Sequence, residues 1–363
     1  MEKVEPEEKQ LEILVNPDPL ESARIAGLHY IDEDEPGFQR KRRGRGFTYL
    51  YPNGERVEDE ALRARFESLV IPPAWTEVWI SVHPEGHIQA TGRDDKGRKQ
   101  YIYHPLWEQI RNQAKFNRMI AFGESLPMIR GQVDEDLVRR KLSREKVVAI
   151  VVKLLEETLI RIGNREYARR NSSYGLTTLQ TEHLDISGAK LHFTFQGKSG
   201  KEQDIELRDR RLARLIKRCQ EIPGQELFQY IDDEGVHQRI TSTDVNEYLR
   251  NVTGLDFSAK DFRTWGGTVL AALELYEAGP GDTKTETNRK IVAAVKAVAE
   301  ALGNTPAICR KYYIHPSILA AYEDNSLFPV MRKALIEAEE TPTGLNAQET
   351  AVLEMLRKPL NEL

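Results

Sequence analysis

The chain has 363 residues, of which 40% are hydrophobic and 30% charged, and its formal net charge is −5. This composition is typical of a globular protein in water, and the length leaves room for two domains with separate cores. Apolar runs stay well short of bilayer length, and the first residues lack the apolar core of a signal peptide. Two cysteines, Cys219 and Cys309, do not make a disulfide scaffold, so a reducing cytoplasm is the expected location, nucleoid-associated if the source is bacterial.

The negative net charge is unevenly distributed along the chain. Residues 1–35 carry eleven acidic and three basic side chains, a net charge of −8, which leaves +3 for the remainder. We interpret this segment as a loosely held acidic leader with one short helix. A mildly positive body can bind a polyanion if its basic residues are clustered, so the overall charge does not exclude a nucleic-acid partner.

A cluster of that kind follows the leader. Residues 40–45 contain five basic residues in six positions, between flexible glycines. The pattern predicts a basic loop, and two interpretations stay open: a solvated surface loop, or an arm that grips phosphates through Arg42, Arg43 and Arg45.

Residues 47–103 have the pattern of short strands and turns, with one helix over 58–69. Basic residues occupy a turn before the strand 99–103, and period-two alternation puts Tyr101 and Tyr103 on one face. Basic loops beside aromatic and amide side chains suit a surface that lies along a nucleic-acid groove, with Arg98, Lys99 and Gln100 as further candidates. Half-buried tyrosines of an ordinary sheet are an equal alternative.

From about residue 106 the period becomes helical. We expect helices over 106–122, 134–142 and 147–159, with Ser143 as a candidate cap of the last. One three-stranded meander interrupts them, with strands at 183–186, 190–195 and 203–207 and Lys198 on its glycine-flanked tip. Helices then continue to the C-terminus. The expected domains are the leader 1–35, a β-rich DNA-binding domain 36–110 and a helical domain 111–363.

The segment 303–316 combines strong helix signals with two tyrosines. Gly303 can close one helix, Thr305 and Pro306 can open the next, and Pro316 limits its continuation. One of the tyrosines could be core packing or a nucleophile. A nucleophile would require cations elsewhere in the chain.

Two arginines stand in unusual settings. Arg161 follows a strongly apolar helix, where an isolated charge is costly, and Arg263 lies in the first turns of a helix, where a cation opposes the macrodipole. Each alone fits a structural ion pair. Together with Lys198 and Tyr313 they suggest a phosphodiester site.

The chemistry of such a site is simple. A tyrosine phenol, with a pKa of about 10, is a poor nucleophile toward an anionic diester. Arg161 and Arg263 could hold the non-bridging oxygens bidentately, Asn304 could donate a neutral hydrogen bond, and Lys198 could protonate the leaving oxygen. The sequence has no Cys-x-x-Cys or Walker glycine loop, and its His-x-x-x-His, at His83 and His87, spans a predicted turn and not a helix, so neither a metal nor ATP is expected, and we expect no cofactor.

Six stretches, in this order, resemble the type IB DNA topoisomerases of the poxvirus-like and bacterial branch. They are GRKQYIY at 97–103, IRIG at 160–163, YGLTTL at 174–179, FQGKSG at 195–200, KDFRTW at 260–265, and NTP at 304–306 with Tyr313. The resemblance covers about residues 35–325. An ordered set of this kind is far more specific than any single stretch.

The resemblance implies an α+β protein of two domains: a small β-rich N-terminal domain and a larger, mainly helical catalytic domain that carries the meander. It implies a C-shaped clamp on duplex DNA, a monomer, and relaxation of supercoils by transient cleavage of one strand. Tyr313 would form a 3′-phosphotyrosyl bond, Arg161 and Arg263 would clamp the phosphate, and Lys198 would be the general acid.

The sequence departs from that pattern at Asn304, where poxvirus-like members carry histidine. A neutral amide cannot add charge, so a proton-transfer role of histidine does not carry over. The family spacing of nine positions from Asn304 selects Tyr313 as nucleophile and makes Tyr312 a packing residue. Cys309 is expected to be a small core residue.

Two alternatives remain open. Tyrosine recombinases use nearly the same residues, but they usually carry histidine where this chain has Lys260, and a helical domain precedes their catalytic domain. Lys260 itself could contact DNA or be a plain surface lysine. A DNA-binding protein without chemistry would need only the basic loops.

Overall fold

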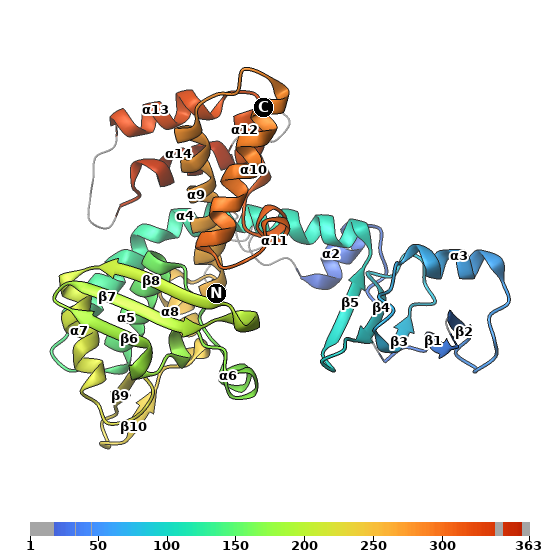
Figure 1. The fold of residues 1–363 in the computed structure, drawn as a ribbon, viewed down its shortest axis with the longest axis horizontal. Helices are drawn as coiled ribbons and strands as arrows, with labels where there is room; N and C mark the ends of the chain where they lie inside the picture. The colour runs from blue at the N-terminus through green and yellow to red at the C-terminus, as the bar shows by residue number, and fades with distance from the viewer. Residues whose placement is uncertain (1–17, 33, 45, 338–343, 358–363) are drawn as a thin grey trace, which may run out of the picture. The chain divides into compact units, whose positions relative to one another are not determined.

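The computed structural model describes residues 18–32, 34–44, 46–337 and 344–357, and divides the chain into two compact units, Met1–Asn117 and Arg118–Leu363 (Figure 1). The division falls inside helix α4 (Pro105–Leu137), so one helix runs on from the first unit into the second. The α+β class, with a β-sheet unit followed by a mainly helical unit that contains a small three-stranded sheet, is confirmed.

The first unit is built on a five-stranded antiparallel sheet with the order β2-β1-β3-β4-β5 (Figure 1). Its described elements are α2 (Pro19–Ile25), β1 (Phe38–Arg43), β2 (Gly46–Leu50), α3 (Glu60–Ser68), β3 (Thr76–Ile80), β4 (Ile88–Arg93) and β5 (Lys99–Tyr103). Helix α3 covers the sheet through Phe66, whose ring lies 4.9 Å from the rings of Phe38 and Tyr49. Phe66 is 1% exposed, so these contacts form the core of the unit.

The predicted basic loop at residues 40–45 is wrong. Residues 38–43 form strand β1, which pairs with β2 so that Arg43 faces Gly46. Arg40 is buried and donates hydrogen bonds to the carbonyl oxygens of Ile71 (2.8 Å), Pro72 (2.8 Å) and Trp75 (3.1 Å). The guanidinium of Arg40 therefore binds the backbone of residues 71–75 and does not face solvent. Arg42 and Arg43 are exposed on the strand, and Arg45 lies outside the described residues.

The leader is also more closely attached than expected where the structure describes it. Asp18 caps α2, and Ala23 and Leu28 are buried against Trp107. The backbone nitrogen of Ile31 donates to Nδ1 of His87 at 2.9 Å. Residues 1–17 of the predicted leader lie outside the described part of the chain.

Helix α4 replaces the two separate helices predicted at 106–122 and 134–142. Its Pro127 removes one backbone donor, and a proline inside a helix is locally costly. The flanking side chains of Leu126 and Ile129 are each 1% exposed, so the turn around Pro127 is held in the core. Tertiary packing outweighs the local cost of the proline.

The described part of the second unit contains a three-stranded and a two-stranded sheet among its helices. Strands β6 (Leu184–Ser187), β7 (Lys190–Gln196) and β8 (Glu202–Arg208) form the predicted antiparallel meander, and β9 (Gln229–Ile231) pairs with β10 (His237–Arg239). The described helices after α4 are α5 (Arg144–Thr158), α6 (Arg165–Asn171), α7 (Arg210–Gln220), α8 (Ser242–Thr253), α9 (Ala259–Ala278), α10 (Lys284–Ala301), α11 (Pro306–Tyr312), α12 (Pro316–Glu323), α13 (Leu327–Glu337) and α14 (Ala347–Arg357). The α6 helix and the β9–β10 hairpin were not predicted.

Helix α9 is the centre of this unit (Figure 1). It packs against α5, α8, α10, α12, α13 and α14, and half of its residues are buried. Because α9 carries Arg263 and approaches Tyr313 through Gly267 and Thr268, it positions part of the candidate site. None of the described helices is long and apolar enough to cross a bilayer alone; α10 and α11 meet the length and composition test only as a pair bent by 96°.

Candidate active site

Arg161 lies in the short non-helical segment between α5 and α6. Leu159 ends the helix in the left-handed conformation, with φ of 52°. The following residues run alongside the glycine-containing stretch 174–178, whose Leu176 nitrogen donates to the Arg161 carbonyl at 2.9 Å. A Cβ on Gly175 would lie 2.4 Å from that carbonyl, so only glycine permits this approach. Two of the sequence stretches thus meet to hold the Arg161 backbone.

The Arg161 side chain reaches the segment that precedes α11. Its guanidinium donates to Oδ1 of Asn304 at 2.6 Å and to the carbonyl of Gly303 at 3.4 Å. Gly303 closes α10 with φ of 57°, as predicted, and thereby directs Asn304 toward the arginine. Burial lowers the pKa of Arg161, and the phenol of Tyr313 partly offsets this effect.

Arg263 comes from the first turns of α9 and is 4% exposed. Its guanidinium donates to the carbonyl oxygens of Leu159 and Leu302, the latter at 2.7 Å. Burial lowers the pKa of Arg263 to about 10, and the neighbouring Arg161 acts in the same direction, while Tyr313 opposes both. Two cations thus lie close together, an arrangement that favours an anion between them.

Tyr313 ends α11 beside these arginines. Thr305 caps the helix and Pro306 occupies its first turn, as predicted. Helix α9 holds the tyrosine backbone closely, because the hydroxyl of Thr268 donates to the Tyr313 carbonyl at 3.2 Å and Gly267 leaves the space for it. The Cζ atom of Arg263 lies 5.4 Å from the centre of the Tyr313 ring.

Two polar atoms of this cluster have no hydrogen-bond partner within the described residues. They are Nε of Arg263 and Nδ2 of Asn304, both buried donors. The amide orientation of Asn304 follows from Arg161, which can only donate and so must face the oxygen. Since buried donors are almost always satisfied, two orphaned N–H groups next to two cations indicate a place for an acceptor such as a phosphate oxygen.

Lys198 does not join this cluster through a direct contact. It is exposed on the tip between β7 and β8, in the short turn η3 (Lys198–Gly200). The tip is nevertheless tied to the site, because Nζ of Lys201 donates to the Asn304 carbonyl at 3.3 Å. The side chain of Gln203 also lies close to Gly303. Lys198 is therefore on a hairpin whose stem touches Asn304.

The remaining predicted DNA contacts are on the first unit. Tyr101 and Tyr103 share one face of β5, with parallel rings 5.8 Å apart, and are 37% and 36% exposed. Lys99 lies over the Tyr101 ring at 5.7 Å. Arg98 and Gln100 both donate to Asp94, and Arg98 holds the pKa of that carboxyl down to about 2. These two side chains are thus held in place by Asp94.

Several other residues differ from the expectation or were missed. Tyr312, expected to be packing, is 38% exposed, with Nζ of Lys311 5.3 Å from its ring centre, whereas Cys309 is fully buried as predicted. Lys260 is exposed on α9.

The roles of Thr268 and Lys201 were not predicted; a Gly-Gly-Thr run directly after the KDFRTW stretch is the signal that could have pointed to Thr268. In the described part of the chain no group of three or more His, Cys, Asp or Glu side chains could hold a metal ion.

Two family models and several known proteins match this chain. The family described as "Eukaryotic DNA topoisomerase I, catalytic core" matches residues 105–336, and the "Bacterial DNA topoisomerase IB, N-terminal domain" matches residues 46–94. The DNA topoisomerase 1B of Acanthamoeba polyphaga mimivirus is 33% identical over 306 residues, covering 82% of this chain and 90% of that protein. The DNA topoisomerase 1B of Vaccinia virus (strain Copenhagen) is 24% identical over 252 residues, covering 68% and 76%.

One solved structure shows a much weaker likeness. It is a XerH site-specific recombinase bound to its difH substrate, with a TM-score of 0.34 and 15% identity, covering 56% of this chain and 52% of that chain. The fold and family assignments do not depend on this likeness.

Proposed function

The chain belongs to the type IB DNA topoisomerases, and we propose that it relaxes supercoiled duplex DNA through a transient 3′-phosphotyrosyl bond on Tyr313. Relaxation of DNA is the activity of this family. The residues around Tyr313 would carry out the reaction.

The proposal depends on one observation. Two buried arginines lie beside the Tyr313 phenol, and two buried N–H groups of this cluster have no hydrogen-bond partner among the described residues. Arg161 and Arg263 both have a lowered pKa because burial disfavours their charge, and an anion between them would relieve that cost. Nε of Arg263 and Nδ2 of Asn304 would complete the set of donors. The site is thus organised for a dianionic, five-coordinate phosphorus before DNA arrives.

The proposed step exchanges one phosphodiester bond for another. The phenol oxygen of Tyr313 attacks the phosphorus, the phenol proton passes to solvent, and the bond from phosphorus to the 5′ oxygen breaks. The departing 5′ oxygen takes a proton, which we assign to Lys198 on its hairpin tip. The reverse reaction reseals the strand after the free end has rotated. Because the number of phosphoester bonds is conserved, superhelical torsion alone drives relaxation.

Further DNA contacts are proposed on the first unit and on α9. The face of β5 with Tyr101 and Tyr103 presents aromatic rings, and Lys99 and the exposed Arg42 and Arg43 add charge. Arg98 and Gln100 would contact DNA while braced by Asp94. Lys260 and Arg45 complete this set. A clamp of the two units around the duplex, and a monomeric enzyme, remain predictions from the family.

A plasmid assay tests the proposal. Supercoiled plasmid is incubated in EDTA without nucleotide with the parent protein, Tyr313→Phe and Tyr312→Phe. We expect a ladder of relaxed topoisomers from the parent and Tyr312→Phe, and none from Tyr313→Phe. Relaxation by Tyr313→Phe would overturn the assignment of the nucleophile, and a parent that binds plasmid without relaxing it would favour the non-catalytic alternative. Joining of two linear duplexes without torsion would instead favour recombination.

A further inference from the structure

The first turn of α9 is held by side chains from two other helices. Ser258 and Asp261 form a capping box, in which the Ser258 nitrogen donates to Oδ2 of Asp261 at 2.8 Å. Oδ1 of Asn246 on α8 accepts from the Ala259 nitrogen at 3.1 Å. These bonds satisfy free N–H groups at the helix start, and they would do so without any cation nearby.

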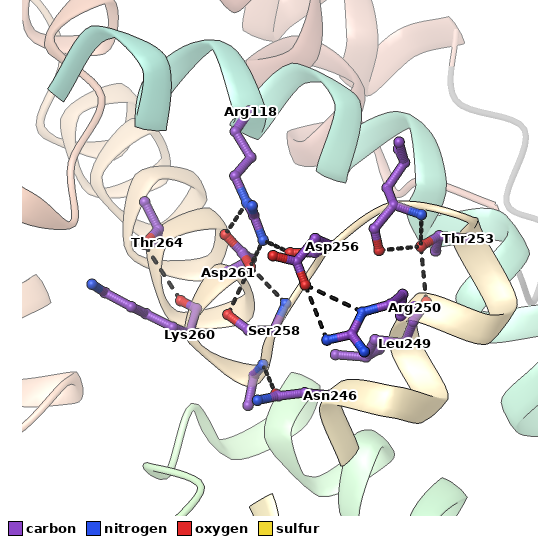
Figure 2. Close-up of polar contacts among 12 residues, drawn as sticks. Arg118, Asn246, Leu249, Arg250, Thr253, Asp256, Ser258, Lys260, Asp261 and Thr264 are labelled. Atoms are coloured by element: carbon purple, nitrogen blue, oxygen red, sulfur yellow. Dashed lines mark hydrogen bonds and ion pairs between the residues drawn. The ribbon is translucent and has the colours of Figure 1, made fainter. Parts of the chain in front are cut away.

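Arg118 on α4 nevertheless binds the same carboxylate (Figure 2). Its Nε and Nη2 donate to the two oxygens of Asp261 at 3.0 and 2.9 Å, a bidentate pair. Nη2 also donates to the carbonyl of Asp256, and the Arg118 guanidinium lies 5.2 Å from the ring centre of Phe257. The two charged side chains are only 14% and 17% exposed, so solvent screens this pair less than a surface salt bridge.

Asp261 lies in the same helical turn as two basic residues of the proposed site. Asp261 directly follows Lys260 and precedes Arg263 by two residues, in the turn that presents both side chains. Arg263 has its guanidinium fixed by two carbonyl oxygens, so a shift of this turn would move it relative to Leu159 and Leu302. Arg118 is also the first residue of the second unit on a helix that continues from the first.

We propose that the Arg118–Asp261 pair is a positioning device: it locks the first turn of α9 to α4 and so sets Arg263, and Lys260 beside it, against the scissile phosphate. The inference rests on the proposed function, because it concerns the placement of that site. It assigns no contact with DNA to Arg118. A carboxylate that only capped the helix would not need a bidentate arginine from α4.

The test measures cleavage at saturating enzyme, so that weaker DNA binding does not enter the rate. A duplex oligonucleotide is used whose short 5′-terminal fragment dissociates after cleavage. Arg118→Gln, Asp261→Asn, the double variant and Arg118→Lys are compared with the parent, with DNA affinity and thermal stability measured in parallel. Asp261→Asn keeps an oxygen for the cap, and Arg118→Gln leaves the cap untouched.

We expect each single variant to lower the saturated cleavage rate about 10- to 100-fold, as a misplacement of about 1 Å does, with DNA affinity nearly unchanged. The double variant should be no slower than the slower single variant, because the two residues act as one unit. Arg118→Lys should regain part of the rate. The matched control is Arg250→Gln: Arg250 pairs with Asp256 at 3.1 Å in the same network, but both side chains are half exposed, and the parent rate is expected.

The outcomes separate the two proposals. Arg118→Gln that is folded and cleaves at the parent rate overturns the positioning role, even if its melting temperature falls. If Arg118→Gln does not fold, Arg118→Lys is the deciding variant. A saturated cleavage rate of Arg118→Lys equal to that of the parent overturns the positioning role. A loss of cleavage rate in Arg250→Gln as large as in Arg118→Gln would also overturn the positioning role. A parent that does not cleave, whatever the variants do, overturns the proposed function and this inference together.

Discussion

Replacement of Asn304 by aspartate leaves the shape of the side chain almost unchanged but adds one negative charge to the site. Oδ1 of Asn304 already accepts from Arg161 at 2.6 Å, so a carboxylate would form an ion pair there. That pair would satisfy Arg161, whose charge is disfavoured by burial, and the desolvation of the new carboxylate would offset part of the gain. We therefore expect Asn304→Asp to leave the melting temperature unchanged or raised.

The rate of strand cleavage, in contrast, should fall in Asn304→Asp. Two negative charges about 4 Å apart repel by about 4 kcal/mol at an effective dielectric constant of about 20, and this corresponds to about 10³-fold in rate. Asn304→Ala is the control, because it adds no charge: it removes the amide's hydrogen bond to the phosphate, worth about 1 kcal/mol or roughly 5-fold, together with the acceptor of Arg161. Single-turnover cleavage of a duplex oligonucleotide measures both variants. Equal rates for the aspartate and alanine variants would refute the placement of a phosphate beside Asn304.

Three further outcomes follow from the structure. Lys198→Ala should lower cleavage by about 10²- to 10⁴-fold, and a 5′-sulfur leaving group, with a pKa near 8.5, should restore it; equal loss on both substrates would contradict a general acid at Lys198. Glu349 is buried and binds Arg130 at 2.8 and 3.0 Å, so Glu349→Gln should cost about 3 kcal/mol and lower the melting temperature by roughly 10 °C, and an unshifted melting curve would contradict this. Burial raises the pKa of Cys219 to about 12, so the unfolding free energy should fall as pH rises above about 9, where only the unfolded chain ionises this thiol; Cys219→Ala should remove that part of the slope.

Local signals predicted the elements around the nucleophile well. Gly303 takes the left-handed conformation, Thr305 caps α11, and Pro306 occupies its first turn, because each of these preferences acts within a few residues. The meander followed from alternating apolar positions around turn residues, and its three strands pair as expected. Helix and strand ends that are set by capping and turn residues a few positions away can therefore be inferred from the sequence.

Features set by distant contacts could not be predicted in this way. Arg40 looked like part of a solvated basic run, and only the carbonyl oxygens of residues 71, 72 and 75 explain its burial. Two separate helices were predicted at 106–122 and 134–142, although the packing of α4 keeps one helix continuous through Pro127. The bond between Arg161 and Asn304 joins residues 143 positions apart, and so does the pair of Arg118 with Asp261. Their proximity is a property of the fold.

The identity of the candidate site was accessible from sequence mainly through the order of its motifs. Arg263 alone resembled a structural cation, since a helix start disfavours a positive charge. Its burial, its two carbonyl partners and the unsatisfied Nε became visible only in three dimensions. Lys198 shows the reverse case: the sequence selected it, whereas its exposed side chain has no contact that would have singled it out among the described lysines.

A direct identification of the DNA-linked residue decides whether a phenol at position 313 attacks the phosphodiester. Covalent protein–DNA complex is trapped in EDTA on an oligonucleotide that loses its 5′ fragment, then digested with protease and nuclease and sequenced by mass spectrometry. The account predicts a peptide that carries a 3′-linked nucleotide on Tyr313. A nucleotide on Tyr312, a 5′ linkage, or no covalent peptide at all would contradict it.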